Sequence, residues 1–265
     1  MRMMSIASGS SGNCIYIGTD NAHILVDDGI SKKRVIEGLA QLDLSLDDID
    51  AILVTHEHDD HIRGIGVLER QSITPVYGTS GTINYISGYK SLGKIPEEIY
   101  HSVISGEEFS IKDLTIKPVS VSHDAIDPVA YVFSQGDKRC GILTDLGYFT
   151  DEILHNFSNL NAMLVEANHD INMLMTGPYP YSLKQRILGN SGHLSNESCG
   201  RMLGEMLCDT TEHVFLGHLS KENNFPDLAY ETVRMEINLG DNPFKAEDFN
   251  IRVAKRDAPS DIISI

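Results

Sequence analysis

The segment 56–61, HEHDDH, concentrates the side chains with which proteins most often bind transition metals. His56 and His58 lie two positions apart directly after an apolar run, so both imidazoles can point the same way from the end of a strand. Asp60 and His61 then open the next helix, where they can face a second metal ion. Mixed imidazole and carboxylate ligands suit zinc, manganese or iron rather than calcium. The alternative, a polar surface loop, does not explain so many ligand types in one short segment.

Polar residues also follow several other predicted strands. Short β-rich runs alternate with helical patterns, which favours a layered α/β architecture with substantial sheets. The predicted strands are Cys14–Gly18, His23–Val26, Ala51–Val54, Leu114–Ser120, Val129–Phe133, Lys138–Leu143, Ala162–Val165, His213–Leu216 and Asn250–Ala254. The predicted helices are Ser31–Ala40, His61–Arg70, Ser80–Ser87, Asp151–Phe157, Tyr181–Leu188, Asn196–Leu207 and Asp227–Ile237. The polar residues that follow strand ends, and can converge on one sheet edge, are Asp27, His56, His123, Asp145 and His218.

The HEHDDH segment resembles the HxHxDH signature of the metallo-β-lactamase superfamily, and the other motifs of that superfamily occur in the same order. They are 24–29 (ILVDDG), 122–124 (SHD), 143–147 (LTDLG) and 216–218 (LGH). The resemblance implies a four-layer αββα sandwich, formed by residues 1–265 as a single domain. It also implies two divalent metal ions, either zinc or manganese, with iron as a further option.

The resemblance assigns a role to the polar residue of each motif. The residues implied at the first metal are His56, His58, His123 and Asp145. The residues implied at the second are Asp60, His61, Asp145 and His218. Asp145 would therefore bridge the two ions, and Asp60 would also orient the attacking water. Asp27 would support the ligands from behind.

Within the superfamily, the chain resembles the WalJ/YycJ-type proteins, small bacterial members described as DNA exonucleases. The segments that carry this likeness are 7–13 (ASGSSGN), 165–170 (VEANHD), 177–180 (GPYP), 183–187 (LKQRI), 192–196 (GHLSN) and 218–224 (HLSKENN). Aspartate rather than cysteine at the bridging position disfavours the β-lactamase branch. The likeness implies a metal-dependent phosphodiesterase, specifically a 5′→3′ exonuclease that acts on DNA rather than RNA.

The tetrapeptide GHLS occurs twice, with its histidine at His193 and at His218. His218 ends an apolar run, so it has the strand-end position of the other expected ligands. His193 follows a glycine-containing loop and precedes a helix that Ser195 or Asn196 can cap. In tRNA-processing relatives, a histidine at this place is paired with a glutamate and protonates the leaving oxygen. The resemblance carries this general-acid role to His193 and the orienting role to Glu166. The pKa of a histidine suits general-acid catalysis near neutral pH. Alternatively, His193 only packs the loop.

Substrate contacts are predicted from side chains that can meet phosphates or bases. The candidates are Ser10, Asn13, Tyr179, Lys184, Arg186 and Ser220. The lysine and arginine can neutralise phosphates and the tyrosine can stack on a base, although an ordinary helix surface gives the same pattern. The first two belong to a Gly/Ser turn that either holds an anion or simply needs the freedom of glycine. Arg63 is more simply a surface residue of the next helix, and His169 and Asp170 stay unassigned.

Composition limits the partners and the compartment. The formal net charge of −17 argues against general affinity for nucleic acid, because phosphate binding needs Lys and Arg. This charge favours the alternative of a hydrolase of a small phosphodiester or carboxylic ester; a non-enzymatic metal-binding regulator is a third hypothesis. The sequence predicts neither a membrane span nor a signal peptide, and indicates no oligomeric state. Four cysteines without a CxxC pair predict a reduced cytoplasmic protein.

Overall fold

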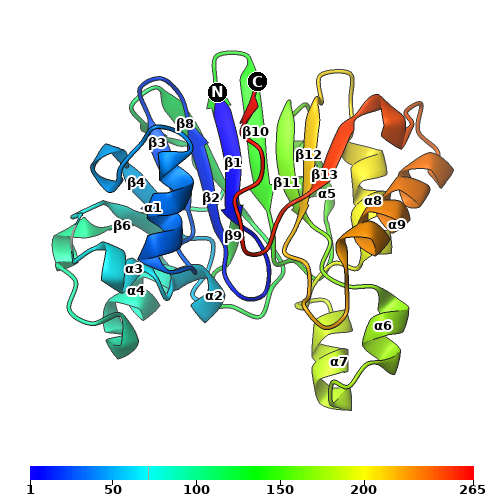
Figure 1. Ribbon diagram of the computed structural model, residues 1–265, viewed down its shortest axis with the longest axis horizontal. Coiled ribbons are helices and arrows are strands. Elements are labelled where there is room, and N and C mark those ends of the chain that lie inside the picture. Colours follow the sequence, from blue (N-terminus) through cyan, green and yellow to red (C-terminus); the bar gives the residue numbers. More distant parts are fainter. Residues whose placement is uncertain (71) are drawn as a thin grey trace. The chain divides into compact units, whose positions relative to one another are not determined.

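The computed structural model describes residues 1–70 and 72–265, and the chain divides into two compact units. The first unit consists of Met1–Ser120, Ala125–Gln135 and Lys255–Ser264, and the second of Val121–Asp124, Gly136–Ala254 and Ile265. Each unit has β-strands with helices packed beside them (Figure 1). Among the described residues, no helix is long and apolar enough to cross a membrane.

The first unit is built on a mixed sheet with the strand order β14-β1-β2-β3-β4-β5-β6. Its strands are β1 (Arg2–Ala7), β2 (Cys14–Gly18), β3 (His23–Val26), β4 (Ala51–Leu53), β5 (Val76–Thr79), β6 (Tyr100–Val103) and β14 (Ile263–Ser264). Pairing is antiparallel from β1 to β3 and parallel from β3 to β6. The parallel register sets Val26 beside Leu53. Asp27 and the segment 56–61 therefore leave the sheet at the same edge.

Helices and a second set of strands complete the first unit. The helices are α1 (Lys32–Ala40), α2 (Asp59–Ile62), α3 (Ile65–Leu68) and α4 (Ser80–Gly88), with 3-10 turns η1 (Leu46–Asp48), η2 (Lys90–Leu92) and η3 (Glu97–Ile99). Strands β7 (Phe109–Ile111), β8 (Leu114–Ser120) and β9 (Val129–Gln135) pair antiparallel. The core buries Val35 and Leu39 of α1 together with Ile6 of β1 and Ile52 of β4. This burial of one helix face against the sheet holds the strand ends in place.

The second unit contains four parallel strands whose ends lie level with one another. They are β10 (Lys138–Leu143), β11 (Ala162–Glu166), β12 (His213–Gly217) and β13 (Asn250–Val253). The register pairs Leu143 with Val165 and Val165 with Leu216. Asp145, Glu166 and His218, which come one or two residues later, therefore emerge together at the carboxyl edge of these strands.

The helices of the second unit cover its strands and shape the segment around His193. They are α5 (Asp151–Asn156), α6 (Ile171–Thr176), α7 (Tyr181–Leu188), α8 (Asn196–Met206) and α9 (Pro226–Leu239), with the 3-10 turn η4 (Ala246–Asp248). The hydroxyl of Ser195 accepts a hydrogen bond from the Ser198 amide and caps α8, as one of the two predicted caps. Gly200 permits close packing of α8 on α9, since a Cβ there would lie 2.5 Å from the Glu236 Cβ.

Every predicted strand has a counterpart in the structure, but the predicted helix His61–Arg70 is wrong. The chain forms two short helices instead, α2 and α3, interrupted around Gly64. The Gly64 amide donates to the Asp28 carbonyl oxygen at 2.8 Å rather than continuing the helix. A Cβ at this position would lie 2.4 Å from an Asp28 carboxylate oxygen, so only glycine fits the interruption. The sequence analysis also missed β1, β5, β6, β7, β14 and α6.

Candidate metal centre

The first unit gathers the four side chains of the HEHDDH segment that were predicted to bind metal. The ring centroid of His56 lies 4.6 Å from that of His58 and 4.1 Å from that of His61. The Nε2 atom of His61 is 3.6 Å from an Asp60 carboxylate oxygen. His56 and His61 are buried, whereas His58 and Asp60 are half-buried. Imidazole and carboxylate groups at this spacing form a donor set suited to a divalent transition metal.

Asp27 makes buried hydrogen bonds to this segment and to the residue that precedes it. Its buried carboxylate accepts a hydrogen bond from His61 Nδ1 at 2.7 Å and from the Thr55 amide at 2.8 Å. The Thr55 hydroxyl adds a bond of 2.9 Å. Because Nδ1 of His61 donates to a carboxylate, its Nε2 is left as the atom with a lone pair for a metal.

Replacing Asp27 with asparagine should lower the affinity of the protein for zinc by about 10- to 100-fold, because an amide is a weaker acceptor for His61 Nδ1 than a carboxylate. Asparagine also tolerates the positive φ of this residue, 61°, so the backbone is preserved. Competition with a chromophoric chelator measures the affinity. Asp43→Asn is the matched control, since Asp43 lies in an exposed turn with φ of 58°. Wild-type affinity in Asp27→Asn would contradict the supporting role.

In the second unit, Glu166 is the centre of a buried hydrogen-bond network. One carboxylate oxygen lies 2.8 Å from Nδ1 of His193 and 2.9 Å from Nδ1 of His218. The other accepts bonds from the amides of Leu146 and Leu194, at 3.1 and 3.2 Å. The side chain has no exposure to solvent. Glu166 therefore contacts both histidines, including the one predicted to be the general acid.

Asp145 lies beside the same histidines. One of its carboxylate oxygens is 3.4 Å from Nδ1 of both His193 and His218, and 3.9 Å from Nε2 of His123. Nδ1 of His123 lies 3.0 Å from the Gly192 carbonyl oxygen, so His123 is another imidazole whose Nε2 is left for a metal. Ligand atoms of Asp145, Glu166, His193 and His218 all lie within 4.8 Å of one another, a grouping that can hold a metal ion.

Three of the predicted site residues have a backbone conformation that is uncommon outside glycine. Asp27, Asp145 and His218 adopt φ of 61°, 61° and 53°. Each comes directly after or within two residues of a strand end, where this turn redirects the side chain. Such conformations cost free energy and cluster at functional sites, although aspartate and histidine adopt them more readily than most residues.

The electrostatics of the second unit favour an ionised Glu166. Burial alone would raise the pKa of Glu166, but the imidazoles of His193 and His218 hold the pKa well below its usual range. For His193, burial has the opposite effect and lowers the pKa. The negative charges of Glu166 and then Asp145 outweigh burial, so the pKa of His193 is raised overall. For His123 burial dominates and lowers the pKa, which favours the neutral imidazole that binds metals.

The predicted substrate contacts are more scattered, and several of these side chains have partners within the protein. The Lys184 ammonium donates to the carbonyl oxygens of Met175 and Gly177, at 2.7 and 2.8 Å. Arg186 forms an ion pair with Asp124. Ser220 is buried, and its hydroxyl accepts a hydrogen bond from the Asn223 amide. Asn13 is buried against His61. Tyr179 is half-buried and Ser10 is exposed. Their contacts with a substrate stay predictions.

His169 and Asp170, which the sequence left unassigned, have local contacts in the structure, and Asn168 is a further residue near the site that was not predicted. The Asp170 carboxylate caps α6 by accepting from the Met173 amide, and His169 is buried beside Asn168. Asn168 itself donates to the carbonyl oxygen of His218 at 2.9 Å and so supports that turn. Asn168 lies within the segment 165–170 that carries the family likeness, but its residue type alone does not indicate this supporting contact.

Comparisons with known proteins point to one family. A family model described as a beta-lactamase superfamily domain matches residues 23–218. Exodeoxyribonuclease WalJ of Streptococcus pneumoniae is 41% identical over 89% of this chain and 88% of its own. Exodeoxyribonuclease YycJ of Bacillus anthracis is 39% identical over 86% of both chains. The solved metallo-beta-lactamase fold protein YhfI from Bacillus subtilis matches with a TM-score of 0.67 over 98% of both chains at 16% identity, a likeness of fold alone.

Proposed function

Because the chain belongs to the beta-lactamase superfamily, we propose that it is a metal-dependent phosphodiesterase that degrades DNA as a 5′→3′ exonuclease. Membership confirms the predicted fold class, the αββα sandwich of the metallo-β-lactamase type. The observation that carries the proposal is the identity of 39–41% over most of the chain to relatives named exodeoxyribonucleases. The single domain over residues 1–265 is part of the same proposal.

The proposed centre binds two divalent ions, zinc or manganese with iron as an option. The proposed ligands are His56, His58, Asp60, His61, His123, Asp145 and His218. Support comes from the donor types and from three histidines, His61, His123 and His218, whose Nδ1 atoms face an acceptor and leave Nε2 for a metal. When bound, such ions lower the pKa of a water towards about 7 and offset the charge that develops on a phosphate.

The side chains of the protein supply the remaining chemistry. In this proposal, Asp60 orients the attacking water towards phosphorus, and Nε2 of His193 donates a proton to the leaving oxygen. Glu166 supports the acid function because its contact with Nδ1 fixes the ring and favours the protonated imidazole. His193 is also the more exposed of the two histidines on Glu166, with 20% of its side chain accessible against 2% for His218. That difference favours contact of His193 with a substrate.

Hydrolysis of a small phosphodiester or carboxylic ester is the second candidate, favoured by the net charge of −17. A non-enzymatic metal-binding regulator is the third, disfavoured because a candidate acid accompanies the ligands. Bis-p-nitrophenyl phosphate and 5′-labelled duplex DNA, each assayed with manganese, discriminate among them. Turnover of the small ester with no cleavage of any nucleic acid would favour the second candidate, and no turnover of either by the metal-loaded protein would favour the third.

End-labelled DNA tests the polarity of the proposed nuclease. The label of a 5′-labelled duplex should appear in mononucleotides at the earliest times, whereas a 3′ label should stay with the shortening strand. Parallel reactions with RNA test the preference for DNA, and reactions with single strands show whether a duplex is required. Early release of the 3′ label would instead indicate a 3′→5′ exonuclease.

We also propose that the protein works in the reducing cytoplasm, a compartment supported by the free Cys14, Cys140, Cys199 and Cys208.

A further inference from the structure

The loop between β1 and β2, Gly9–Gly12, is bracketed by two arginines from distant parts of the first unit. Arg63, which follows α2, donates from Nε to the Gly29 carbonyl oxygen at 2.8 Å and from a terminal nitrogen to the Ser11 carbonyl oxygen. Gly12 permits this approach, since a Cβ there would lie 2.5 Å from the Gly29 oxygen and 3.0 Å from the Arg63 guanidinium. Arg63 is nonetheless exposed, so part of its guanidinium faces solvent.

Arg256 lies on the other side of this loop. Its guanidinium is 3.5 Å from the Ser10 hydroxyl and would be 2.8 Å from a Cβ at Gly9, so it packs directly on the loop backbone. Its carbonyl oxygen accepts a hydrogen bond of 2.8 Å from Arg34 of α1, which fixes the backbone at this point. We call Gly9–Gly12 with Arg63 and Arg256 the arginine-bracketed loop.

Asn13 connects the arginine-bracketed loop to two of the proposed metal ligands in the same unit. The side-chain oxygen of Asn13 accepts from the Gly9 amide at 2.9 Å. Its backbone amide donates to the Asp60 carbonyl oxygen at 2.8 Å, and its side-chain nitrogen is 3.1 Å from Nε2 of His61. Through Asn13, the loop therefore adjoins Asp60 and His61, two proposed metal ligands of the same unit.

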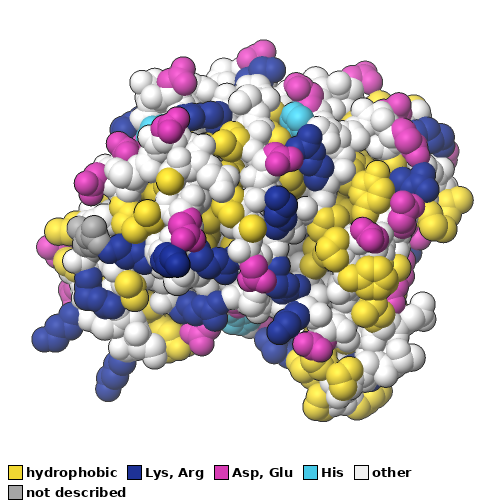
Figure 2. Space-filling model, viewed as in Figure 1, with side chains coloured by type: hydrophobic (Ala, Val, Ile, Leu, Met, Phe, Trp, Pro, Cys, Tyr) yellow, Lys and Arg dark blue, Asp and Glu magenta, His cyan; other side chains and the backbone are white. Residues whose placement is uncertain are grey.

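Several Lys and Arg side chains lie near the loop, although the protein as a whole is acidic, and one of them, Arg34, pairs with Asp257. The formal net charge is −17, yet Lys and Arg side chains gather over the part of the face that carries α1 (Figure 2). α1 begins with Lys32, Lys33 and Arg34, and the last of these is the residue bonded to Arg256. In an acidic protein, a local basic surface next to candidate metal ligands is suited to the phosphates of a nucleic acid rather than to a neutral ester.

We propose that the arginine-bracketed loop binds a backbone phosphate of the DNA strand, close to the phosphodiester that is cut. The guanidinium groups of Arg63 and Arg256 supply the charge, and the exposed Ser10 hydroxyl supplies a further donor. This assignment rests on the proposed nuclease function and names the part of the first unit that holds its substrate. It also explains how a chain with excess negative charge can retain a DNA strand.

The salt dependence of the reaction tests the loop. With the metal-loaded protein, Arg256→Ala should raise the KM for DNA about tenfold, because it removes a charged donor to a phosphate. The slope of log KM against log salt should fall by about 0.9 for duplex DNA, the value expected for one lost phosphate contact. Arg256→Lys keeps the charge and should keep the slope, which a purely structural role for Arg256 would not require. Elemental analysis and thermal unfolding establish that each variant retains its metal and its fold.

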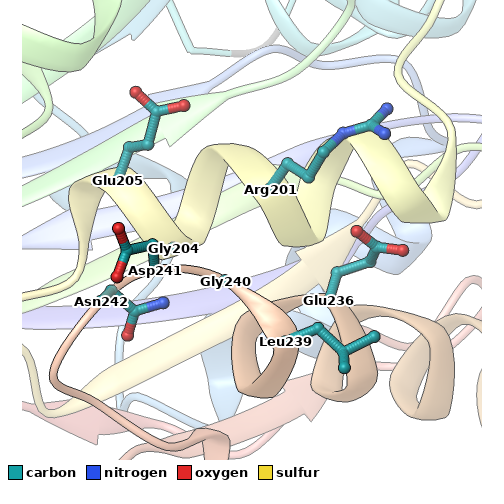
Figure 3. Close-up of a pocket in the computed structure, with 8 residues that line it drawn as sticks. All are labelled: Arg201, Gly204, Glu205, Glu236, Leu239, Gly240, Asp241 and Asn242. Carbon is teal, nitrogen blue, oxygen red and sulfur yellow. The ribbon is translucent and has the colours of Figure 1, made fainter.

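Arg201→Ala is the matched control because it removes the same charge elsewhere. Arg201 lies on α8 at a pocket of about 420 Å³ that is also lined by Glu205, Glu236 and Asp241 (Figure 3). These carboxylates repel phosphate, so this variant should keep the wild-type KM and slope. A wild-type slope in Arg256→Ala and in Arg63→Ala, with DNA still cut by the wild-type protein, would overturn the loop assignment alone. Absence of DNA cleavage by the wild-type protein would instead overturn the proposed function.

Discussion

Asp145→Asn should abolish DNA hydrolysis, with a loss of about four orders of magnitude or more, equivalent to ~5.5 kcal/mol in the activation free energy. Asp145 is proposed to bridge both metal ions, so an amide there weakens both sites at once. Its carboxylate is buried and faces His123, His193 and His218. Asparagine matches the volume of aspartate and tolerates φ of 61°, so the fold should persist.

The readouts are DNA turnover and the metal content of the purified Asp145→Asn protein, and both should fall. The Asp43→Asn protein is again the control, because it makes the same chemical change at the same backbone conformation in an exposed turn. A folded Asp145→Asn protein with its full metal content and near-wild-type turnover would exclude Asp145 as a bridging ligand.

His193→Ala is the second large effect, and it should separate chemistry from metal binding. Turnover of DNA should fall by about 10²- to 10⁴-fold, the usual contribution of a general acid. The metal content should stay at the wild-type level, because His193 is proposed to protonate the leaving oxygen rather than to bind an ion. A retained metal content would be informative, because His193 belongs to a cluster with Asp145, Glu166 and His218 whose ligand atoms can themselves hold a metal ion.

The leaving group supplies an independent readout for His193. A p-nitrophenolate departs without protonation, so hydrolysis of bis-p-nitrophenyl phosphate should suffer far less than hydrolysis of DNA. His155→Ala, which removes an exposed histidine from α5, controls for the loss of an imidazole. If the His193→Ala protein lost half of its metal, the division of labour between His193 and His218 would be wrong.

The sequence predicts the strand-end residues well because the relevant signal is local. A short apolar run followed by a polar residue locates Asp27, Asp145 and His218, and within the second unit the parallel register aligns β10 with β12 through β11. The different surroundings of the two GHLS segments are also local, since the first ends in Ser195, the N-cap of α8, and the second begins at Gly217, the last residue of β12.

Other features depend on contacts between residues far apart in the sequence. The helix predicted over His61–Arg70 breaks because Gly64 bonds to Asp28, a contact that helical periodicity does not encode. The partners of Lys184 and Arg186 are likewise set by the packing of α6, α7 and Asp124 rather than by residue type. Arg256 lies more than 240 residues from the loop that it contacts, so no short motif reveals it.

The most direct test of the central claim is the fate of labelled duplex DNA before and after removal of metal. The purified protein is analysed for bound elements, stripped with a chelator and reconstituted with manganese or zinc. We expect the stripped protein to leave 5′-labelled duplex intact and the reconstituted protein to release the 5′ label as mononucleotides at the earliest times. Cleavage that survives complete removal of metal, or a reconstituted protein that hydrolyses bis-p-nitrophenyl phosphate but no DNA, would contradict a metal-dependent 5′→3′ DNA exonuclease.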